Sequence, residues 1–271
     1  MEWVNEEPTS RSIWLWNEGE YSGDMGDGFK PWLDPYPIET DRARGAVLVC
    51  PGGGYENRAP HEAGIIAKRF NSEGYHAFVV HYSVAPRRHP QPLKDVSRAI
   101  RIIRSRASEW KVDPDHIAVC GFSAGGHLTG SIGVHYDKDY LKGNNPLDSI
   151  NNRPDALILC YPVISSGKFA NEGSFMNLLG DQDTPEVRRE MSLELQVNEN
   201  TPPAFLWHTV SDDGVPVENS ILFASALRAH GVGFEMHLYP VGQHGLGLAE
   251  GDPHIATWAG LCGQWLKGLG F

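Results

Sequence analysis

Short apolar runs alternate with longer amphipathic segments along most of this 271-residue chain. Four of the six runs are almost continuously apolar instead of alternating with polar residues. That pattern is typical of parallel strands that are covered on both faces. We therefore predict a strand at each run. The runs cover residues 45–50, 76–82, 116–120, 155–161, 204–209 and 234–239.

The segments between these runs have helical periodicity. In 91–108, apolar residues recur at steps of three and four, which predicts an amphipathic helix. Its arginines fall mostly outside the apolar stripe, and we expect them to form a solvated face instead of a nucleic-acid-binding patch. The apolar positions are Leu93, Val96, Ile100, Ile103 and Ala107, and the arginines are Arg98, Arg101, Arg104 and Arg106. Further helices are predicted at 60–72, 124–135, 217–230 and 253–267.

The alternation of strands and helices predicts a protein of the α/β class. A mainly parallel, doubly wound sheet flanked by helices, with right-handed crossovers, is the arrangement that such an order of elements favours. No sequence period of about 20 to 50 residues recurs, so the chain is not a repeat protein. Because α/β folds of this length are often single units, we predict one domain over residues 1–271.

Two segments, the polar and turn-rich 137–153 and the longer 165–202, interrupt the alternation, and the first 40 residues precede it. The first 40 residues contain Trp3, Trp14, Trp16 and Trp32, and we expect this segment to wrap around the body instead of forming a separate domain. Residues 165–202 form a long excursion between two predicted strands. A surface insertion is one interpretation. We favour a small cap over a site at the strand ends, because long loops in compact domains are often functional.

Composition and charge exclude several kinds of partner. The formal net charge of −11 argues against binding to nucleic acids or to an anionic membrane surface. No run of about 18 apolar residues is present, so no membrane span is predicted. The first residues lack a basic segment followed by an apolar one, so we expect a cytoplasmic protein. The four cysteines lack the spacing of a metal site, and we expect reduced core thiols, no metal and no cofactor.

The stretch "CGFSAGGHL" (120–128) places a serine between glycines, in the pattern G-x-S-x-G. A predicted strand ends at Cys120, and a predicted helix begins after Ser123. A sharp turn between a strand and a helix holds a serine in a strained conformation, and Gly121 and Gly125 permit the close approach that the turn requires. The serine would also lie at a helix N-terminus, where free N–H groups favour developing negative charge.

A second glycine-rich loop, "VCPGGGYENR" (49–58), follows the first predicted core strand. A nucleotide-binding loop would need Gly-Lys-Ser/Thr, which is absent, or a glycine at position 57, where Asn57 stands. We therefore favour a loop whose backbone N–H groups bind an oxyanion next to Ser123.

Two later loops contain an acid and a histidine. Asp212 and Asp213 follow the predicted strand 204–209, and His244 follows the strand 234–239. A serine hydroxyl is a poor nucleophile until an imidazole accepts its proton, and a carboxylate fixes the tautomer of that imidazole. Serine, then acid, then histidine is a chain order that such a triad can take. His208, at a strand end, is interpreted as a core histidine, and a role in supporting the triad residues is the alternative.

Together these stretches resemble the α/β-hydrolase-fold carboxylesterases, and in particular the bacterial acetyl xylan and sugar-acetyl esterases. The shared stretches, which run from about residue 12 to residue 250, are "IWLWNEGE", "AVLVCPGGGYENRAPHEAG", "HYSVAP", "DPDHIAVCGFSAGGHL", "LCYPVIS", "WHTVSDDGVPVENS" and "GQHGLGL".

The resemblance implies roles for individual residues. Ser123 would be the nucleophile and His244 the base. In the related pattern H-x-x-x-D-x-x-x-P, His208 and Pro216 select Asp212 over Asp213 as the acid. The loop "PGGG" resembles the HGGG loop of lipases and esterases, with Pro51 in place of the histidine. The implied oxyanion donors are Gly53, Gly54 and Ala124, and the implied substrate-binding residues are Tyr55, Arg58, His61 and His127.

The resemblance also implies an activity. We expect a serine esterase that cleaves short-chain, above all acetyl, esters of small molecules or oligosaccharides such as acetylated xylo-oligosaccharides, through an acyl-enzyme. Another hydrolase of the same fold is the first alternative: an arylformamidase, a peptidase or a longer-chain esterase. A catalytically inactive binding protein with this fold is the second, and the presence of all three triad residues weighs against it.

Overall fold

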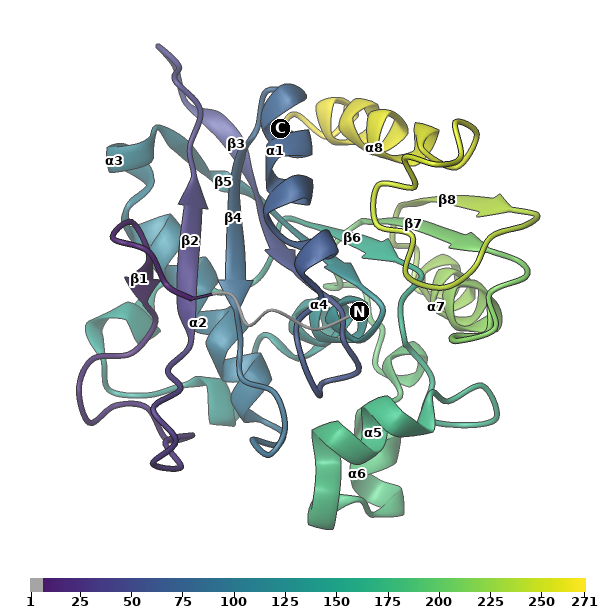
Figure 1. Ribbon diagram of the computed structural model, residues 1–271, viewed down its shortest axis with the longest axis horizontal. Coiled ribbons are helices and arrows are strands. Elements are labelled where there is room, and N and C mark those ends of the chain that lie inside the picture. Colours follow the sequence, from purple (N-terminus) through teal and green to yellow (C-terminus); the bar gives the residue numbers. More distant parts are fainter. Residues whose placement is uncertain (1–6) are drawn as a thin grey trace.

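A single eight-stranded sheet forms the centre of the molecule in the computed structural model, which describes residues 7–271. The strand order is β1-β2-β4-β3-β5-β6-β7-β8. From β4 to β8 across the sheet all neighbours are parallel, whereas β1 and β2 run antiparallel at one edge (Figure 1). The strands are β1 (Ile13–Trp14), β2 (Trp32–Tyr36), β3 (Arg44–Cys50), β4 (His76–His81), β5 (Val112–Phe122), β6 (Ala156–Cys160), β7 (Ala204–Thr209) and β8 (Phe234–Tyr239).

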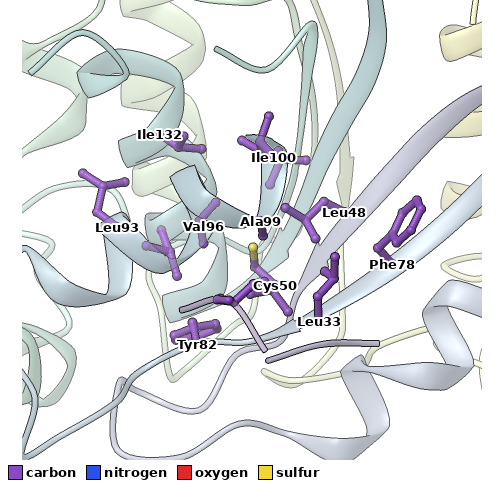
Figure 2. Close-up of a cluster of buried hydrophobic side chains, with 14 of the residues drawn as sticks. Leu33, Leu48, Cys50, Phe78, Tyr82, Leu93, Val96, Ala99, Ile100 and Ile132 are labelled. Carbon is purple, nitrogen blue, oxygen red and sulfur yellow. The ribbon is translucent and has the colours of Figure 1, made fainter. Parts of the chain in front are cut away.

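All six strands predicted from apolar runs are present, and the α/β-hydrolase fold is confirmed. The central strands are apolar on both faces because helices cover both faces. The helices α2 (Gln91–Ser105), α4 (Ala124–His135) and α7 (Glu218–Ala229) pack on one face. The helices α1 (Gly64–Ser72) and α8 (Thr257–Gly268) pack on the other. Figure 2 shows the first face, where Val96 and Ile100 of α2 meet Leu48 of β3.

The edge strands β1 and β2 were not predicted. Trp32 of β2 pairs with His81 of β4, and the two rings stack with centroids 4.2 Å apart. The strand β2 contains Asp34 and Pro35, and β1 pairs only with its first two residues. Proline is tolerated where a strand lacks a ladder partner on one side. The described part of the N-terminal segment thus extends the main sheet; Trp3 lies outside the described residues.

The expectation of a solvated arginine face on the second helix is wrong for two of its residues. Arg98 and Arg101 of α2 are only 4% and 5% exposed. They are covered by the short helices η2 (Asp139–Leu141) and η3 (Pro146–Ser149) and by the loop around Trp16. The helix α3 (Ala107–Trp110) follows α2 directly.

The excursion 165–202 forms the helices α5 (Glu172–Leu179) and α6 (Pro185–Glu190), with the short helices η4 (Gly180–Gln182) and η5 (Leu193–Leu195). They lie at the bottom of Figure 1, in green. Asn177 donates a hydrogen bond to the carbonyl of Gly54, and Asn171 donates one to the carbonyl of Gly214. The excursion therefore contacts two of the loops that were predicted to form the site. Within residues 7–271, no helix combines the length and the hydropathy needed to cross a membrane.

Candidate active site

Ser123 lies at the turn between β5 and α4 with φ 52° and ψ −118°, a conformation that non-glycine residues rarely adopt. The flanking glycines make room for this turn. A Cβ on Gly121 would lie 2.1 Å from the carbonyl oxygen of Gly125, and one on Gly125 would lie 2.2 Å from that of Cys50. Both distances are far below van der Waals contact, so the turn requires glycine at these two positions.

Three side chains from separate loops form one chain of hydrogen bonds. The Nε2 atom of His244 lies 2.8 Å from the Oγ atom of Ser123, and its Nδ1 atom lies 2.8 Å from Oδ2 of Asp212. With Nδ1–H donated to the carboxylate, Nε2 is free to accept the serine proton. This arrangement can convert the Ser123 hydroxyl into a nucleophile.

The two neighbouring aspartates differ in their surroundings. Asp212 is buried, and its Oδ1 atom accepts hydrogen bonds from the N–H groups of Gly214 and Val215. Asp213 is exposed. Burial raises the pKa of Asp212, but hydrogen bonds from His208, from His244 and from the Val215 N–H outweigh it and hold the pKa well below its usual value. Asp212 is therefore ionised at neutral pH.

His208 contacts Asp212 and the loop that carries it. Its Nε2 atom lies 3.0 Å from the carbonyl of Val215 and 3.4 Å from Oδ2 of Asp212, while its Nδ1 atom bonds the hydroxyl of Ser220. The ring is fully buried, so it fixes the loop that carries Asp212.

The glycine loop 52–54 lies against the nucleophile turn. Gly53 and Gly54 both have positive φ, 123° and 63°. A Cβ on Gly52 would lie 3.1 Å from that of Ser123. In the part of the chain that the structure describes, the N–H groups of Gly53, Gly54 and Ala124 donate to no protein acceptor. Free N–H groups beside a nucleophile can stabilise negative charge on a substrate oxygen.

Glu62 and Tyr161 connect the glycine loop to the histidine loop, and sequence reasoning missed both. Glu62, at the end of the short helix η1 (Pro60–Glu62), is 2% exposed. Its Oε2 atom accepts the Gly52 N–H at 2.8 Å, and its Oε1 atom accepts the Tyr161 hydroxyl proton at 2.5 Å. The Tyr161 oxygen in turn accepts the N–H of Gly247 at 2.8 Å.

This network fixes the two loops relative to each other. Tyr161 has φ 36° and packs its ring edge-on against the His244 ring, with centroids 5.1 Å apart. Burial raises the pKa of Glu62 above its usual value, because its effect outweighs the lowering by the Tyr161 hydrogen bond and by the nearby His61. Two features of the sequence could have indicated this pair. One is a glutamate just before the helix α1, and the other is a tyrosine directly after the strand β6.

The four predicted substrate-binding residues occupy different positions. Tyr55 and His127 are buried, and the Tyr55 hydroxyl bonds Nδ1 of His127 at 2.9 Å. Arg58 donates to the carbonyl of Tyr82 and lies over the Phe29 ring. His61 is half exposed and contacts the carbonyl of Gly245, next to His244. Of the four, His61 contacts the loop that carries His244 through its side chain, whereas the side chains of Tyr55 and His127 are buried in contact with each other.

Comparisons with known proteins agree with the α/β-hydrolase fold. A family model described as BD-FAE matches residues 34–227. The chain is 44% identical to an acetyl ester-xyloside bifunctional hydrolase from Caldicellulosiruptor lactoaceticus, whose crystal structure superposes with a TM-score of 0.93 over 99% of both chains.

Two relatives known from their sequences are much longer than this chain. An endo-1,4-beta-xylanase B from Butyrivibrio fibrisolvens is 43% identical over 91% of this chain and 39% of its own length. An acetylxylan esterase from Xylanibacter ruminicola is 31% identical over 83% of this chain and 45% of its own length. The chain thus spans less than half the length of these relatives. The resemblance to carboxylesterases is confirmed, and the chain belongs to the BD-FAE family of α/β-hydrolase-fold enzymes.

Proposed function

We propose that this chain is a serine esterase that removes short acyl groups, above all acetyl, from carbohydrate esters such as acetylated xylo-oligosaccharides. The observation that carries the proposal is the unbroken chain of hydrogen bonds from Ser123 through His244 to Asp212 at a strained turn. The expected route has two steps and needs no cofactor.

In the first step, Nε2 of His244 accepts the hydroxyl proton as Oγ of Ser123 attacks the ester carbonyl carbon. The N–H groups of Gly53, Gly54 and Ala124 stabilise the resulting oxyanion. The tetrahedral intermediate collapses, the bond to the alcohol oxygen breaks, and His244 returns its proton to the departing alcohol. The acyl group stays on Ser123 as an ester.

In the second step, a water molecule gives a proton to His244 and attacks the acyl-enzyme. The same N–H groups stabilise the second tetrahedral intermediate, and the acid leaves as Ser123 recovers its proton. Asp212, held ionised, stabilises the imidazolium in both steps. Each oxyanion donor is worth roughly 10²–10³ in kcat in enzymes of this mechanism.

The substrate class is supported by two relatives, one named for the acetylxylan ester and the other for acetyl ester-xyloside chemistry. We further propose that the excursion 165–202 is a cap over the site, because Asn177 and Asn171 fasten it to the glycine loop and to the loop after Asp212. The four free cysteines are buried, which supports a cytoplasmic enzyme acting on imported oligosaccharides. Cell fractionation tests that location.

A substrate panel with one matched control variant tests the proposal. The substrates are an acetylated xylo-oligosaccharide, p-nitrophenyl esters of two to eight carbons, an N-formyl arylamine and a peptide. We expect the acetyl esters to be turned over best, and Ser123→Ala to lose activity and labelling by an organophosphonate. Ser131→Ala, on the same helix, is the control, because the Ser131 hydroxyl is buried without a partner among residues 7–271.

Different outcomes contradict different parts of the proposal. Near-native turnover by Ser123→Ala would overturn the mechanism. Loss of activity on every acetylated sugar, with turnover of p-nitrophenyl acetate retained, would overturn only the substrate class. Preferred cleavage of the formyl amide or the peptide would reassign the enzyme to one of the alternatives.

A further inference from the structure

A cavity of about 320 Å³ lies between α2 and the segment 140–148. We call it the α2 pocket. None of its lining residues belongs to the Ser123 site. The residues that matter here are Trp16, Lys94, Arg98, Arg101, Lys142 and Asp148.

The α2 pocket is basic in a protein whose formal net charge is −11. Four cationic side chains line it, against the two carboxylates of Glu20 and Asp148. Lys94, Arg98 and Arg101 stand at positions i, i+4 and i+7 of α2, which places them on one side of the helix. Figure 2 shows the other side, where Val96 and Ile100 pack toward the sheet.

These cations have few carboxylate partners, although Arg101 also donates hydrogen bonds to the carbonyls of Ile150 and Leu141. Arg98 and Arg101 share a single oxygen, Oδ1 of Asp148, at 3.5 Å and 3.1 Å. Burial lowers the pKa of Arg101, Asp148 raises it, and the like charge of Arg98 lowers it again. Lys142 is paired with Asp139, which is exposed. Lys94 has no carboxylate within ion-pair distance among residues 7–271.

Arg98 is the least satisfied of these groups. It is 4% exposed, and its Nε atom has no hydrogen-bond partner among residues 7–271. Its guanidinium lies 4.4 Å from the Trp16 ring centroid, which orients the group but supplies no acceptor. A buried donor without a partner costs free energy, and a bound anion would remove that cost.

The remaining lining indicates what else the ligand carries. Tyr140, Asn144, Asn145 and Ser22 add an aromatic ring, amides and a hydroxyl. Amides and hydroxyls bind ligand hydroxyl groups, while guanidinium and ammonium groups bind a carboxylate or a phosphate. A cavity of about 320 Å³ is at the lower end of the usual range for small-molecule sites, about 300–1,000 Å³.

We propose that the α2 pocket is a non-catalytic binding site for a small, hydroxyl-rich anion, that is, a sugar acid or a sugar phosphate. Lys94, Arg98 and Arg101 bind the anionic group. The amide of Asn144 binds hydroxyls, because the Asn145 amide already bonds Glu20 and the Leu147 N–H. The proposal does not depend on the chemistry of the Ser123 site.

Titration followed by the indole N–H signal of Trp16 tests the site directly. The full chain is labelled with ¹⁵N-tryptophan and titrated with D-glucuronate, glucose 6-phosphate, inorganic phosphate and glucose. We expect both sugar anions to shift the Trp16 signal saturably, with glucose at least about 10-fold weaker because it lacks the charge-assisted bonds. Lys94→Gln should weaken both sugar anions about 5- to 10-fold, and turnover of p-nitrophenyl acetate should stay unchanged.

Lys267→Gln on the exposed end of α8 is the matched control and should bind like the parent protein. Arg98→Met, which keeps the bulk over Trp16, should reduce binding about as much as Lys94→Gln. Saturable binding of only one sugar anion identifies the anionic group and supports the site. The proposal would be overturned if neither sugar anion bound, or if neither variant changed the affinity for the sugar anions. It would also be overturned if glucose bound as tightly as the sugar anions. Inorganic phosphate binding as tightly as glucose 6-phosphate would overturn the recognition of hydroxyls.

Discussion

At the scale of single residues, Asp212 and Asp213 are adjacent in sequence but lie in different environments. Asp212 accepts hydrogen bonds from two backbone N–H groups and from His244, whereas Asp213 is exposed. We expect Asp212→Asn to lower kcat by about 10³–10⁴-fold, because an amide can present its NH₂ group to His244 and stabilise the wrong imidazole tautomer. Steady-state kinetics on p-nitrophenyl acetate measures the effect.

Asp213→Asn is the control for that substitution, since it makes the same chemical change one residue away. It should keep kcat within about twofold of the parent, as expected of a surface substitution that leaves every hydrogen bond of the triad in place. If Asp213→Asn lost most of its activity while Asp212→Asn retained it, the catalytic acid would be Asp213 and not Asp212.

Glu62 gives a second prediction at this scale, as a positioning residue. Its two oxygens accept from Gly52 and Tyr161, and a glutamine has only one oxygen to offer. Glu62→Gln therefore leaves one of these donors without an acceptor and loosens the glycine loop. We expect kcat to fall roughly 10- to 100-fold, since displacements of about 1 Å can cost that much, with KM within about twofold.

Tyr161→Phe should produce a similar loss of kcat, because it removes the link between Glu62 and Gly247. Glu56→Gln, an exposed glutamate in the same loop, is the control and should leave kcat unchanged. Glu62 would be merely structural if Glu62→Gln lowered the thermal stability and the fraction of folded enzyme but left kcat per folded molecule unchanged.

At the scale of elements, Gly125 lets α4 begin directly against the strand β3. A Cβ there would lie 2.2 Å from the Cys50 carbonyl oxygen and 2.4 Å from that of Pro51, and backbone atoms cannot move aside cheaply. We expect Gly125→Ala to lower the free energy of unfolding by about 2–3 kcal/mol or more, as overpacked substitutions do. Urea unfolding followed by circular dichroism measures the change.

Gly251→Ala provides the comparison for Gly125→Ala. Its Cβ would have no neighbour within 4 Å. The expected change in the free energy of unfolding is within about 0.5 kcal/mol, as for ordinary surface positions. If both glycines tolerated alanine equally, the close approach of α4 to β3 would not be what requires glycine at position 125.

The elements also show what the sequence could predict. Six strands were found because each contains a run of apolar residues, and helices cover the central strands on both faces, whereas the edge strand β8 is mostly part-exposed. The strands β1 and β2 were missed because β2 contains an aspartate and a proline, and because it pairs with β4, from Trp32 with His81 to Tyr36 with Ala77, across a long stretch of sequence. The period of α2 shows which side faces the sheet, but not that residues 139–149 fold over its arginines.

The same reasoning explains the site. Ser123, Asp212 and His244 were identified because each follows a strand within a distinctive local motif, and the structure joins them by hydrogen bonds. Their catalytic roles remain predictions that the variants above test. Glu62 and Tyr161 have no such motif. Their significance lies in a contact across 99 positions of sequence, which local patterns do not reveal.

At the scale of the whole molecule, buried neutral histidines make stability depend on pH. Burial lowers the pKa of His127 and of His135 from 6.5 to about 4, and that of the less buried His89 to about 4 as well. In each case the main cause is that burial removes water from the charged ring; His127, for example, is buried between the Tyr55 hydroxyl and the Met191 carbonyl.

Between pH 6.5 and pH 4 the unfolded chain therefore binds more protons at these histidines than the folded protein does, and stability must fall as the pH is lowered through this range. Burial acts in the opposite direction on Asp95, because it raises that pKa from 3.8 to about 6. Protonation of Asp95 in the folded state stabilises the protein as the pH falls below 6. One carboxyl thus offsets part of the effect of three histidines.

We expect the free energy of unfolding to fall between pH 7.5 and pH 5.5, by about 1.4 kcal/mol for each fully buried histidine and by less for His89, before the Asp95 offset. Urea unfolding at the two pH values measures the drop. His135→Gln keeps a donor for the Glu190 carbonyl but cannot titrate, so its drop should be smaller by about 1 kcal/mol. His230→Gln, on the exposed end of α7, should show the parent's drop. Stability that stays level or rises between pH 7.5 and 5.5 would mean that these histidines are already protonated in the folded protein, or that acids other than Asp95 control its response to acid.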